Sequence, residues 1–485
     1  MKLWTLILSF LIGVCSFTQE QFGACFSNYT PTTSVHYNPS SMLDAKVWLD
    51  INVLSGGFYG NNNLAYLNNN SYWNLYRTDG RGVTDDDLRF NQKRNKYGAY
   101  ARGFASVLSA VWSQGDHAAG LSFNVYSYTA ARGIPDYAAK FIEYGVPNYD
   151  IQHQIDYSMR NVNASSVNYG EIKLSYAYTF YKKHRDMLMG GISVKKFLSI
   201  AGAGLNGYEF DFNVQDDTLM QIARLNADAM YTGDPELYAK GGMGLDIGFT
   251  YQKMLRDCNS YYPNTKRMGC QYLPYKYMIA ASIIDIGSVK FDEEKTQFAG
   301  YDFTTYDWYG YAQTEVDEDN VIQTFQNQEA SIDEGRVKKT DRIHLPTAVI
   351  LQGDYNYWAS KVYFNGMITQ GIPVSKEKFG LRRANSLMVG VRYESKWFDI
   401  SLPLSLYEYR YPQLGLSVRF TYLTVGTDKL LSLINKRGDI YGGDIYFHLK
   451  IPFFYHPKCK DKVKSGNGGY DPMKMKKRKT CEAYL

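Results

Sequence analysis

Long apolar runs are missing from this chain of 485 residues. After residue 18, no stretch of about eighteen consecutive apolar residues occurs, which is the length that a helix needs to cross a bilayer. A membrane protein built from helices is therefore excluded. The mean hydropathy of -0.37 is typical of soluble proteins. This average is uninformative where apolar and polar residues alternate, because the two sides of such a strand face different surroundings.

Catalytic and metal-binding motifs are also missing. There is no Gly-x-Ser-x-Gly elbow, and the seven histidines are scattered without metal-ligand spacing. We therefore predict no enzyme, no cofactor and no metal site. His448 leaves one alternative, a barrel enzyme that uses a serine to hydrolyse lipids, but a polar residue lining a pore is the simpler interpretation. The histidines are His36, His117, His153, His184, His344, His448 and His456.

Excess charge is confined to one end of the chain. A net charge of +5 is too diffuse over the whole chain to predict binding to nucleic acid. Residues 456–485, however, contain nine Lys or Arg and three acidic residues. This basic tail is either a solvated, disordered end or a contact for an anionic cell-wall polymer or a periplasmic partner.

A secretory leader is present. Residues 1–18 combine one positive charge, Lys2, with an apolar core and the small residues Ser16 and Thr18 near a plausible cleavage point. Export makes disulfides possible.

Four cysteines form two candidate pairs. Cys258 and Cys270 bracket one loop, so we predict a disulfide between them. Cys459 and Cys481 could close the tail in the same way, and Cys25 would then remain unpaired.

Alternation of apolar and polar residues is the dominant pattern. In residues 443–453 the apolar side chains are Ile445, Phe447, Leu449, Ile451 and Phe453. Residues 170–181 and 242–252 alternate in the same way, and 16% of the chain is aromatic, which suits membrane interfaces. We predict an all-β fold, a transmembrane antiparallel β-barrel of about 14 strands over residues 45–455 in the outer membrane, with the tail in the periplasm. Residues 443–453 should pair with residues 47–53, because an open strand edge in lipid leaves backbone groups unpaired.

Some segments depart from this alternation. Residues 217–230 have helical spacing and predict a short helix in a loop, and residues 428–437 predict a helical turn. A glycine-rich bend at residues 202–207 should separate two strands, and residues 414–424 should form one strand. Residues 292–345 predict a long extracellular excursion with room for one hidden strand.

The segment after the leader carries a family resemblance. Tyr37, Asn38, Pro39 and Ser40 resemble the Asn-Pro-Ala element of the long-chain fatty-acid transporter (FadL-like) superfamily, with Ser40 in place of alanine. Residues 242–251, 282–288 and 438–452 are similar to an uncharacterised Bacteroidota barrel family. The resemblance implies a 14-stranded barrel in which residues 19–44 fold inward as a hatch or plug that includes Asn38, Pro39 and Ser40.

The expected function follows from this resemblance. It implies an outer-membrane barrel that binds or transports hydrophobic small molecules. The alternative is a scaffold barrel without transport, which would anchor surface machinery for secretion or gliding, or anchor the cell envelope, through its loops and basic tail.

Overall fold

The structure of the protein is a computed structural model that describes residues 20–67, 88–91, 96–137, 153–216, 218–232, 237–265, 272–310, 341–373, 378–434 and 440–457. The predicted signal peptide lies outside the described residues, as does the basic tail except for residues 456 and 457. None of the helices in these ranges is long and apolar enough to cross a membrane.

Strands make up most of the described chain. The helices are α2 (Pro31–Ser34), η1 (Pro39–Asp44) and α6 (Leu430–Ile434), the last within the predicted helical turn. The strands are β1 (Leu49–Asn62), β2 (Ala65–Leu67), β3 (Leu88–Phe90), β4 (Lys96–Gln114), β5 (His117–Pro135), β6 (Asp156–Lys183), β7 (Asp186–Val214), β8 (Leu219–Thr232), β9 (Met243–Met254), β10 (Tyr275–Lys290), β11 (Thr296–Tyr309), β12 (Arg342–His344), β13 (Ala348–Trp358), β14 (Val362–Gly371), β15 (Ser386–Glu394), β16 (Phe398–Tyr407), β17 (Tyr411–Leu414), β18 (Leu416–Phe420), β19 (Leu423–Thr427) and β20 (Asp444–Phe453).

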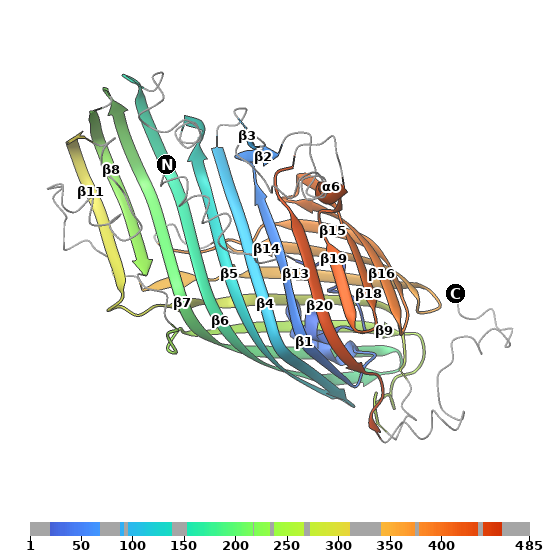
Figure 1. Ribbon diagram of the computed structural model, residues 1–485. Coiled ribbons are helices and arrows are strands. Elements are labelled where there is room, and N and C mark those ends of the chain that lie inside the picture. The colour runs from blue at the N-terminus through green and yellow to red at the C-terminus, as the bar shows by residue number, and fades with distance from the viewer. Residues whose placement is uncertain are drawn as a thin grey trace.

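The main sheet closes on itself as a 14-strand antiparallel β-barrel (Figure 1). Four positions in its wall consist of two consecutive strands each. β8 and β9 share the position next to β7, because both pair with it. β10 and β11 share the following position, since β10 pairs with β9 and β11 pairs with β8. β12 and β13 share the position next to β10, and β17 and β18 share the position next to β16. The predicted fold and strand number are confirmed.

The barrel closes where the alternation predicted. β20 pairs antiparallel with β1 from Leu49↔Phe453 to Tyr59↔Asp444, and β1 pairs with β4 on its other side. Tyr446 and His448 on β20 are buried, whereas Ile445 and Phe447 between them point outward. The same alternation in β6 and β9 gives an apolar outer surface and a polar inner one.

Aromatic side chains gather on the outside at one end of the barrel, where β1 begins and β20 ends. Trp358, Trp397 and Tyr422 are exposed at the tight connections after β13, β15 and β18. Amphipathic rings at this level suit the interface between lipid and water.

At the opposite end the sheet extends further. β6 and β7 contain 28 and 29 residues, and the distal part of β7 pairs with β8, which pairs with β11. Figure 1 shows these strands rising together at one edge of the molecule. On this extension Arg160 pairs with Asp211 at 2.6 Å, and Arg224 pairs with Asp302. Its charged side chains are typical of a surface in water.

The helix predicted for residues 217–230 is wrong, because residues 219–232 form strand β8. The strand has partners on both edges, β7 and β11, which satisfy its backbone groups. Met220 and Ile222 are buried while Gln221 is exposed, so the true period is two. The spacing of three and four among its leucine, isoleucine and alanine residues was incidental.

The glycine-rich bend predicted at residues 202–207 is also wrong, because β7 runs through it without interruption. A Cβ atom at Gly202 would lie 2.7 Å from Cε2 of Phe291, and one at Gly204 would lie 2.5 Å from Cδ1 of Phe379. These glycines make room for aromatic rings inside the barrel rather than for a turn. Residues 414–424, predicted as one strand, contain the turn between β18 and β19.

Residues 292–345 contain two strands, β11 and β12, whereas the sequence prediction allowed for only one. Residues 311–340 lie outside the described part of the chain.

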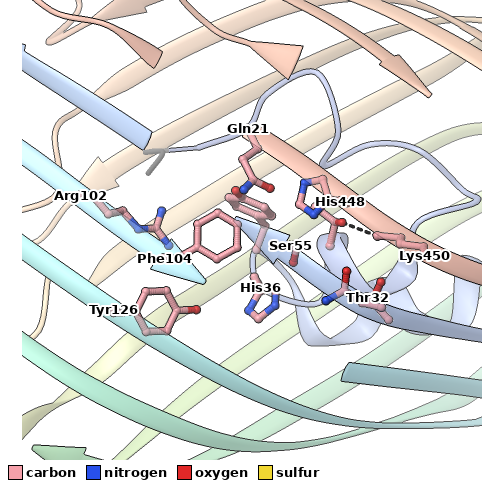
Figure 2. Close-up of a pocket in the computed structure, with 12 residues that line it drawn as sticks. Gln21, Thr32, His36, Ser55, Arg102, Phe104, Tyr126, His448 and Lys450 are labelled. Atoms are coloured by element: carbon pink, nitrogen blue, oxygen red, sulfur yellow. Dashed lines mark hydrogen bonds between the residues drawn. The ribbon is translucent and has the colours of Figure 1, made fainter. Parts of the chain in front are cut away.

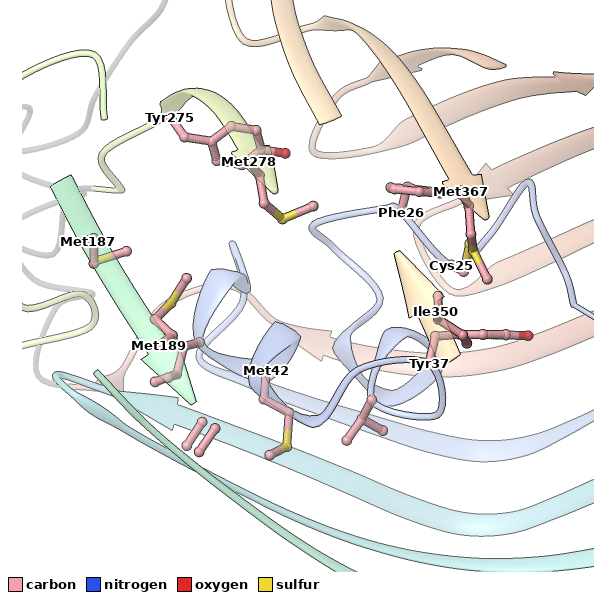
Figure 3. Packing of buried hydrophobic residues seen from close by; sticks show 14 of the residues in the cluster. Cys25, Phe26, Tyr37, Met42, Met187, Met189, Tyr275, Met278, Ile350 and Met367 are labelled. Atoms are coloured by element: carbon pink, nitrogen blue, oxygen red, sulfur yellow. The ribbon is translucent and has the colours of Figure 1, made fainter. Parts of the chain in front are cut away.

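Residues 20–45 are almost entirely buried although they form no strand. η1 packs against β4, β5, β6, β7 and β9, and α2 packs against β1 and β4. Figure 3 shows Met42 of η1, together with Cys25, Phe26 and Tyr37, among methionines of the wall such as Met189 and Met278. Because the unbranched methionine side chain adapts to irregular gaps, this packing needs little shape complementarity.

Candidate functional site

The Asn38-Pro39-Ser40 turn docks on one strand of the wall. Asn38 precedes η1, and its Oδ1 accepts hydrogen bonds from the Ser40 amide at 3.0 Å and the Ser40 hydroxyl at 2.7 Å. The Asn38 Nδ2 donates to Thr250 Oγ1 of β9 at 3.0 Å, and the hydroxyls of Ser40 and Thr250 share a hydrogen bond of 2.7 Å. Pro39 fixes the first φ angle of η1. The structure therefore brings all three sequence-predicted residues together.

Two glycines form the surface under this turn, and we call Gly191 of β7 and Gly248 of β9 the glycine socket. A Cβ atom at Gly191 would lie 2.5 Å from the carbonyl carbon of Pro39 and would also clash with the Ser40 amide nitrogen. One at Gly248 would lie 2.9 Å from Cγ of Asn38 and 3.1 Å from Cδ of Pro39. Only glycine permits this close approach of the turn to the wall.

A group of buried charges, the first network, holds the N-terminal part of this segment. Arg383 Nε lies 3.3 Å from Glu20 Oε1, and Arg383 Nη2 lies 3.0 Å from Asp285 Oδ2. Lys195 Nζ lies 2.6 Å from Asp285 Oδ1. Burial raises the pKa of Glu20, and the neighbouring Arg383 opposes that shift. Burial of charges this complete is tolerated only with partners.

The first network reaches the middle of the segment through Lys173. Its Nζ pairs with Asp246 Oδ2 at 2.9 Å and donates to the carbonyl oxygen of Val35 at 3.1 Å. The adjacent His36 has its pKa lowered well below the usual range by burial, and Lys173 and Lys195 add to the effect.

A second network holds the part nearest the start of β1. Lys46 Nζ lies 2.5 Å from Glu394 Oε1 and 3.1 Å from the Tyr363 hydroxyl. Burial disfavours its charged form, but the attraction of Glu394 outweighs this and raises the pKa of Lys46. The backbone amide of Asn28 donates to Glu394 Oε2 at 3.2 Å, and Arg392 of β15 donates to the Phe26 carbonyl oxygen.

Asp44 lies beside this second network. Its Oδ1 accepts a hydrogen bond of 3.1 Å from the Tyr272 hydroxyl. Burial raises the pKa of Asp44 to about 7, although Lys46 and hydrogen bonds act in the opposite direction.

Three small cavities lie beside the segment in the part of the chain that the structure describes. One cavity has a volume of about 20 Å³ and lies between His36 and Thr32 on the segment and Arg102, Tyr126 and His448 on the wall, whose side chains are drawn in Figure 2. The dashed line beside it is the hydrogen bond of 2.5 Å from Lys450 to Thr33. Two further cavities measure about 20 and 10 Å³. Such volumes suit about one water molecule each, not an organic ligand.

The interior of the barrel next to the segment is lined by aromatic side chains. The guanidinium of Arg102 lies over the rings of Tyr126 and Tyr128, 5.6 and 5.3 Å from their centroids. Tyr128 stacks on Tyr169 with a centroid distance of 6.3 Å. We call the buried, inward-facing set the aromatic cluster: Tyr59, Tyr100, Phe104, Tyr126, Tyr128, Tyr169, Phe197, Phe291 and Phe379.

Sequence reasoning missed the aromatic cluster because it assigned the aromatic content to membrane interfaces. The signal was present in β5, where Tyr126 and Tyr128 share a side with Asn124, while the apolar Phe123 and Val125 occupy the other. An aromatic residue on the polar side of an alternating strand points into the barrel.

The candidate disulfides stay predictions. Cys258 is buried, with its Sγ 3.5 Å from the Asp186 carbonyl oxygen. Cys270, Cys459 and Cys481 lie outside the described residues. Within the described ranges no group of three or more His, Cys, Asp or Glu residues could hold a metal ion.

These features define a closed antiparallel β-barrel with a polar and aromatic interior against which the N-terminal segment packs. The chain belongs to a family of unknown function, "Family of unknown function (DUF5723)", whose model matches residues 39–428. A search of the curated proteins found no match.

Solved structures with a similar arrangement are distant. A Pseudomonas aeruginosa FadL homologue is 10% identical, with 91% of this chain and 99% of that chain covered and a TM-score of 0.39. The Ralstonia pickettii toluene transporter TbuX is 9% identical, with 87% and 93% covered and a TM-score of 0.31. A deltaS2 mutant of the monoaromatic hydrocarbon channel TodX is 9% identical, with 88% and 95% covered and a TM-score of 0.28.

Proposed function

We propose that the protein is an outer-membrane barrel that passes small hydrophobic or amphipathic molecules, and that residues 20–44 are the plug that closes it. The observation that carries this proposal is the way the segment is held. It has its own hydrogen-bonding partners on many wall strands, yet the cavities beside it hold only about a water molecule each. A molecule of organic size would therefore pass only after the segment moves.

The outer surface supports a location in the outer membrane. Outward side chains of β6, β9 and β20 are apolar, and exposed aromatic rings form a belt at one end of the barrel. A closed sheet leaves no open edge in lipid. The 14 wall strands enclose a lumen wide enough to need filling, and the segment supplies that filling.

Transport can be tested in liposomes that contain the purified barrel. We expect dodecanol and dodecanoate to bind, and deletion of residues 20–36 to increase the entry rate of the molecule that binds. Gly353→Ala serves as the control, because a Cβ atom there meets nothing within 4 Å. Absence of binding for both molecules, together with unchanged entry after the deletion, would remove the proposal.

A scaffold function is the second candidate, and the extended sheet favours it. β6, β7, β8 and β11 continue beyond the barrel and carry ion pairs such as Arg160 with Asp211. A surface of this kind suits docking of other envelope proteins, and the basic tail could contact a periplasmic or cell-wall partner. Crosslinking in intact cells tests it: recovery of the barrel without any crosslinked protein argues against a scaffold.

A further inference from the structure

Lys396 is a cation at the surface of the barrel that has no carboxylate beside it. It lies in the tight connection between β15 and β16, and its side chain is partly buried. Its ammonium lies over the rings of Trp397, Phe454 and Tyr455, at 4.9, 4.6 and 5.0 Å from their centroids. Within the described part of the chain, no carboxylate oxygen lies within 4.0 Å of this ammonium. Burial lowers the pKa of Lys396, because the rings displace water without supplying a full negative charge.

The two carboxylates nearest to Lys396 in the sequence are paired with other cations. Glu394 lies inside the barrel and pairs with Lys46 at 2.5 Å. Asp399 is buried as well and pairs with Arg419 at 2.6 Å. Neither carboxylate can turn toward Lys396 without weakening a buried ion pair, which is costly. The positive charge of Lys396 is therefore available to an anion from outside the chain.

The turn that carries this ammonium is held in place from inside the barrel. Arg419 donates hydrogen bonds to the carbonyl oxygens of Ser395 and Lys396, at 2.6 and 3.3 Å. The backbone amide of Thr421 donates to the carbonyl oxygen of Trp397 at 2.9 Å, which ties this turn to the one between β18 and β19. A ligand that binds to a fixed turn does not have to order it first.

The outer surface around the turn is apolar. Trp397, Phe420 and Tyr422 are exposed on the two neighbouring turns. Leu402 and Leu404 of β16 are exposed further along the wall and continue this surface. A phospholipid presents its groups in the same order, with the headgroup at the level of the amphipathic rings and the acyl chains beyond them.

We propose that Lys396 binds the phosphate of an anionic phospholipid, whose acyl chains lie along β16. The inference goes beyond the proposed function, because it concerns the outer surface of the barrel and not the passage through it. A phosphate can reach the ammonium because the lysine side chain is only partly buried. A zwitterionic lipid supplies the same phosphate together with its own cation, which repels Lys396, so the anionic lipid binds better.

Two lipids with the same acyl chains test the site. The full-length barrel in neutral detergent, at neutral pH and low salt, is titrated with dioleoylphosphatidylglycerol and with dioleoylphosphatidylcholine. Native mass spectrometry gives the Kd of the first bound molecule of each lipid. We expect a preference for phosphatidylglycerol that Lys396→Met lowers about fivefold, the effect of one lysine at a membrane surface. Lys396→Arg keeps the charge and should keep the preference.

Lys361→Met is the matched control. Lys361 lies in the tight connection between β13 and β14 at the same end of the barrel, near the exposed Trp358. Within the described residues its ammonium lies over no aromatic ring, so this variant removes the same charge without touching the site. Heat-resistant migration on gels confirms that each variant is folded.

Three results would overturn the inference: equal Kd values for the two lipids in the wild type, an unchanged preference in Lys396→Met, or an equal loss of preference in Lys361→Met. The last would show that the lipid responds to the overall charge of the barrel end and not to one residue. None of these results bears on transport, which the liposome assay with dodecanol and dodecanoate tests separately.

Discussion

Filling the glycine socket should undock the N-terminal segment without unfolding the barrel. Gly191→Ala places a methyl group 2.5 Å from the carbonyl carbon of Pro39 and 2.9 Å from its oxygen. Backbone atoms cannot rotate away, so the turn itself must move. Gly191 has no positive φ angle, which leaves the strand backbone free to accept alanine.

The expected cost can be built from these contacts. Overpacking of this kind costs about 1–3 kcal/mol. Displacing the turn also loses the hydrogen bonds that Asn38 and Ser40 make to Thr250, worth about 1 kcal/mol each. A total of about 3–5 kcal/mol corresponds to a shift of at least 100-fold, to order of magnitude, in the docking equilibrium.

Cys25 provides the assay, because it is buried within the segment. In a protein whose other cysteines are serine, Cys25 should react with a water-soluble maleimide much faster in Gly191→Ala than in the wild type. Gly248→Ala should behave alike, and Gly353→Ala, in open space, should not. Equal labelling rates in all four proteins would refute the docking role of the socket.

Three further predictions concern other parts of the molecule. Lys46→Met removes the ammonium that pairs with Glu394 and should weaken docking by about 3–5 kcal/mol, measured by the same labelling. Because the pKa of Asp44 rises from 3.8 to about 7 on folding, the folded protein binds a proton that the unfolded chain releases, so this residue's contribution to stability falls between about pH 4 and pH 7 and is constant above. The unfolding free energy of the wild type minus that of Asp44→Asn should fall as the pH rises through that window, by at most about 1.4 kcal/mol per pH unit. Truncation after Ile440 removes β20 and should abolish membrane assembly, whereas truncation after Tyr455 should not; normal insertion of the shorter chain would refute the seam.

Each of these predictions has an outcome that contradicts it. Lys253→Met, at an ion pair about one-third exposed, should leave labelling of Cys25 unchanged, and an effect as large as that of Lys46→Met would remove the special role of the buried pair. A pH-independent difference for Asp44→Asn would show that burial does not perturb this carboxyl group.

The fold was predictable because alternation is a local signal. β20 shows it residue by residue, and its pairing with β1 followed from the need to remove strand edges. The turn between β18 and β19 was not predictable, because Thr421 and Tyr422 are not turn formers and Thr421 is in a positive φ conformation of 25°.

The candidate site was predictable only in part. Asn38, Pro39 and Ser40 were found from a short motif. The residues that meet them come from distant strands, such as Gly191 and Thr250. Likewise, nothing local pairs Glu20 with Arg383, which lie 363 positions apart in the chain. Such partners depend on the register of the whole barrel.

The contacts of the N-terminal segment are compatible with the release that the proposed plug function requires. Most wall charges that contact it also have a counterion on the wall. Arg392 pairs with Asp354 at 2.7 Å, Asp399 with Arg419 at 2.6 Å and Lys173 with Asp246 at 2.9 Å, and Arg383 of the connection between β14 and β15 pairs with Asp285 of the wall at 3.0 Å. When the segment leaves, few buried charges therefore lose their only counterion. An unpaired buried charge is the large penalty in breaking a buried ion pair, and most of that penalty is avoided here. The cost that remains lies in the neutral hydrogen bonds, in Lys46 and in the glycine socket, so substitutions at those positions should open the barrel more readily than substitutions among the wall ion pairs.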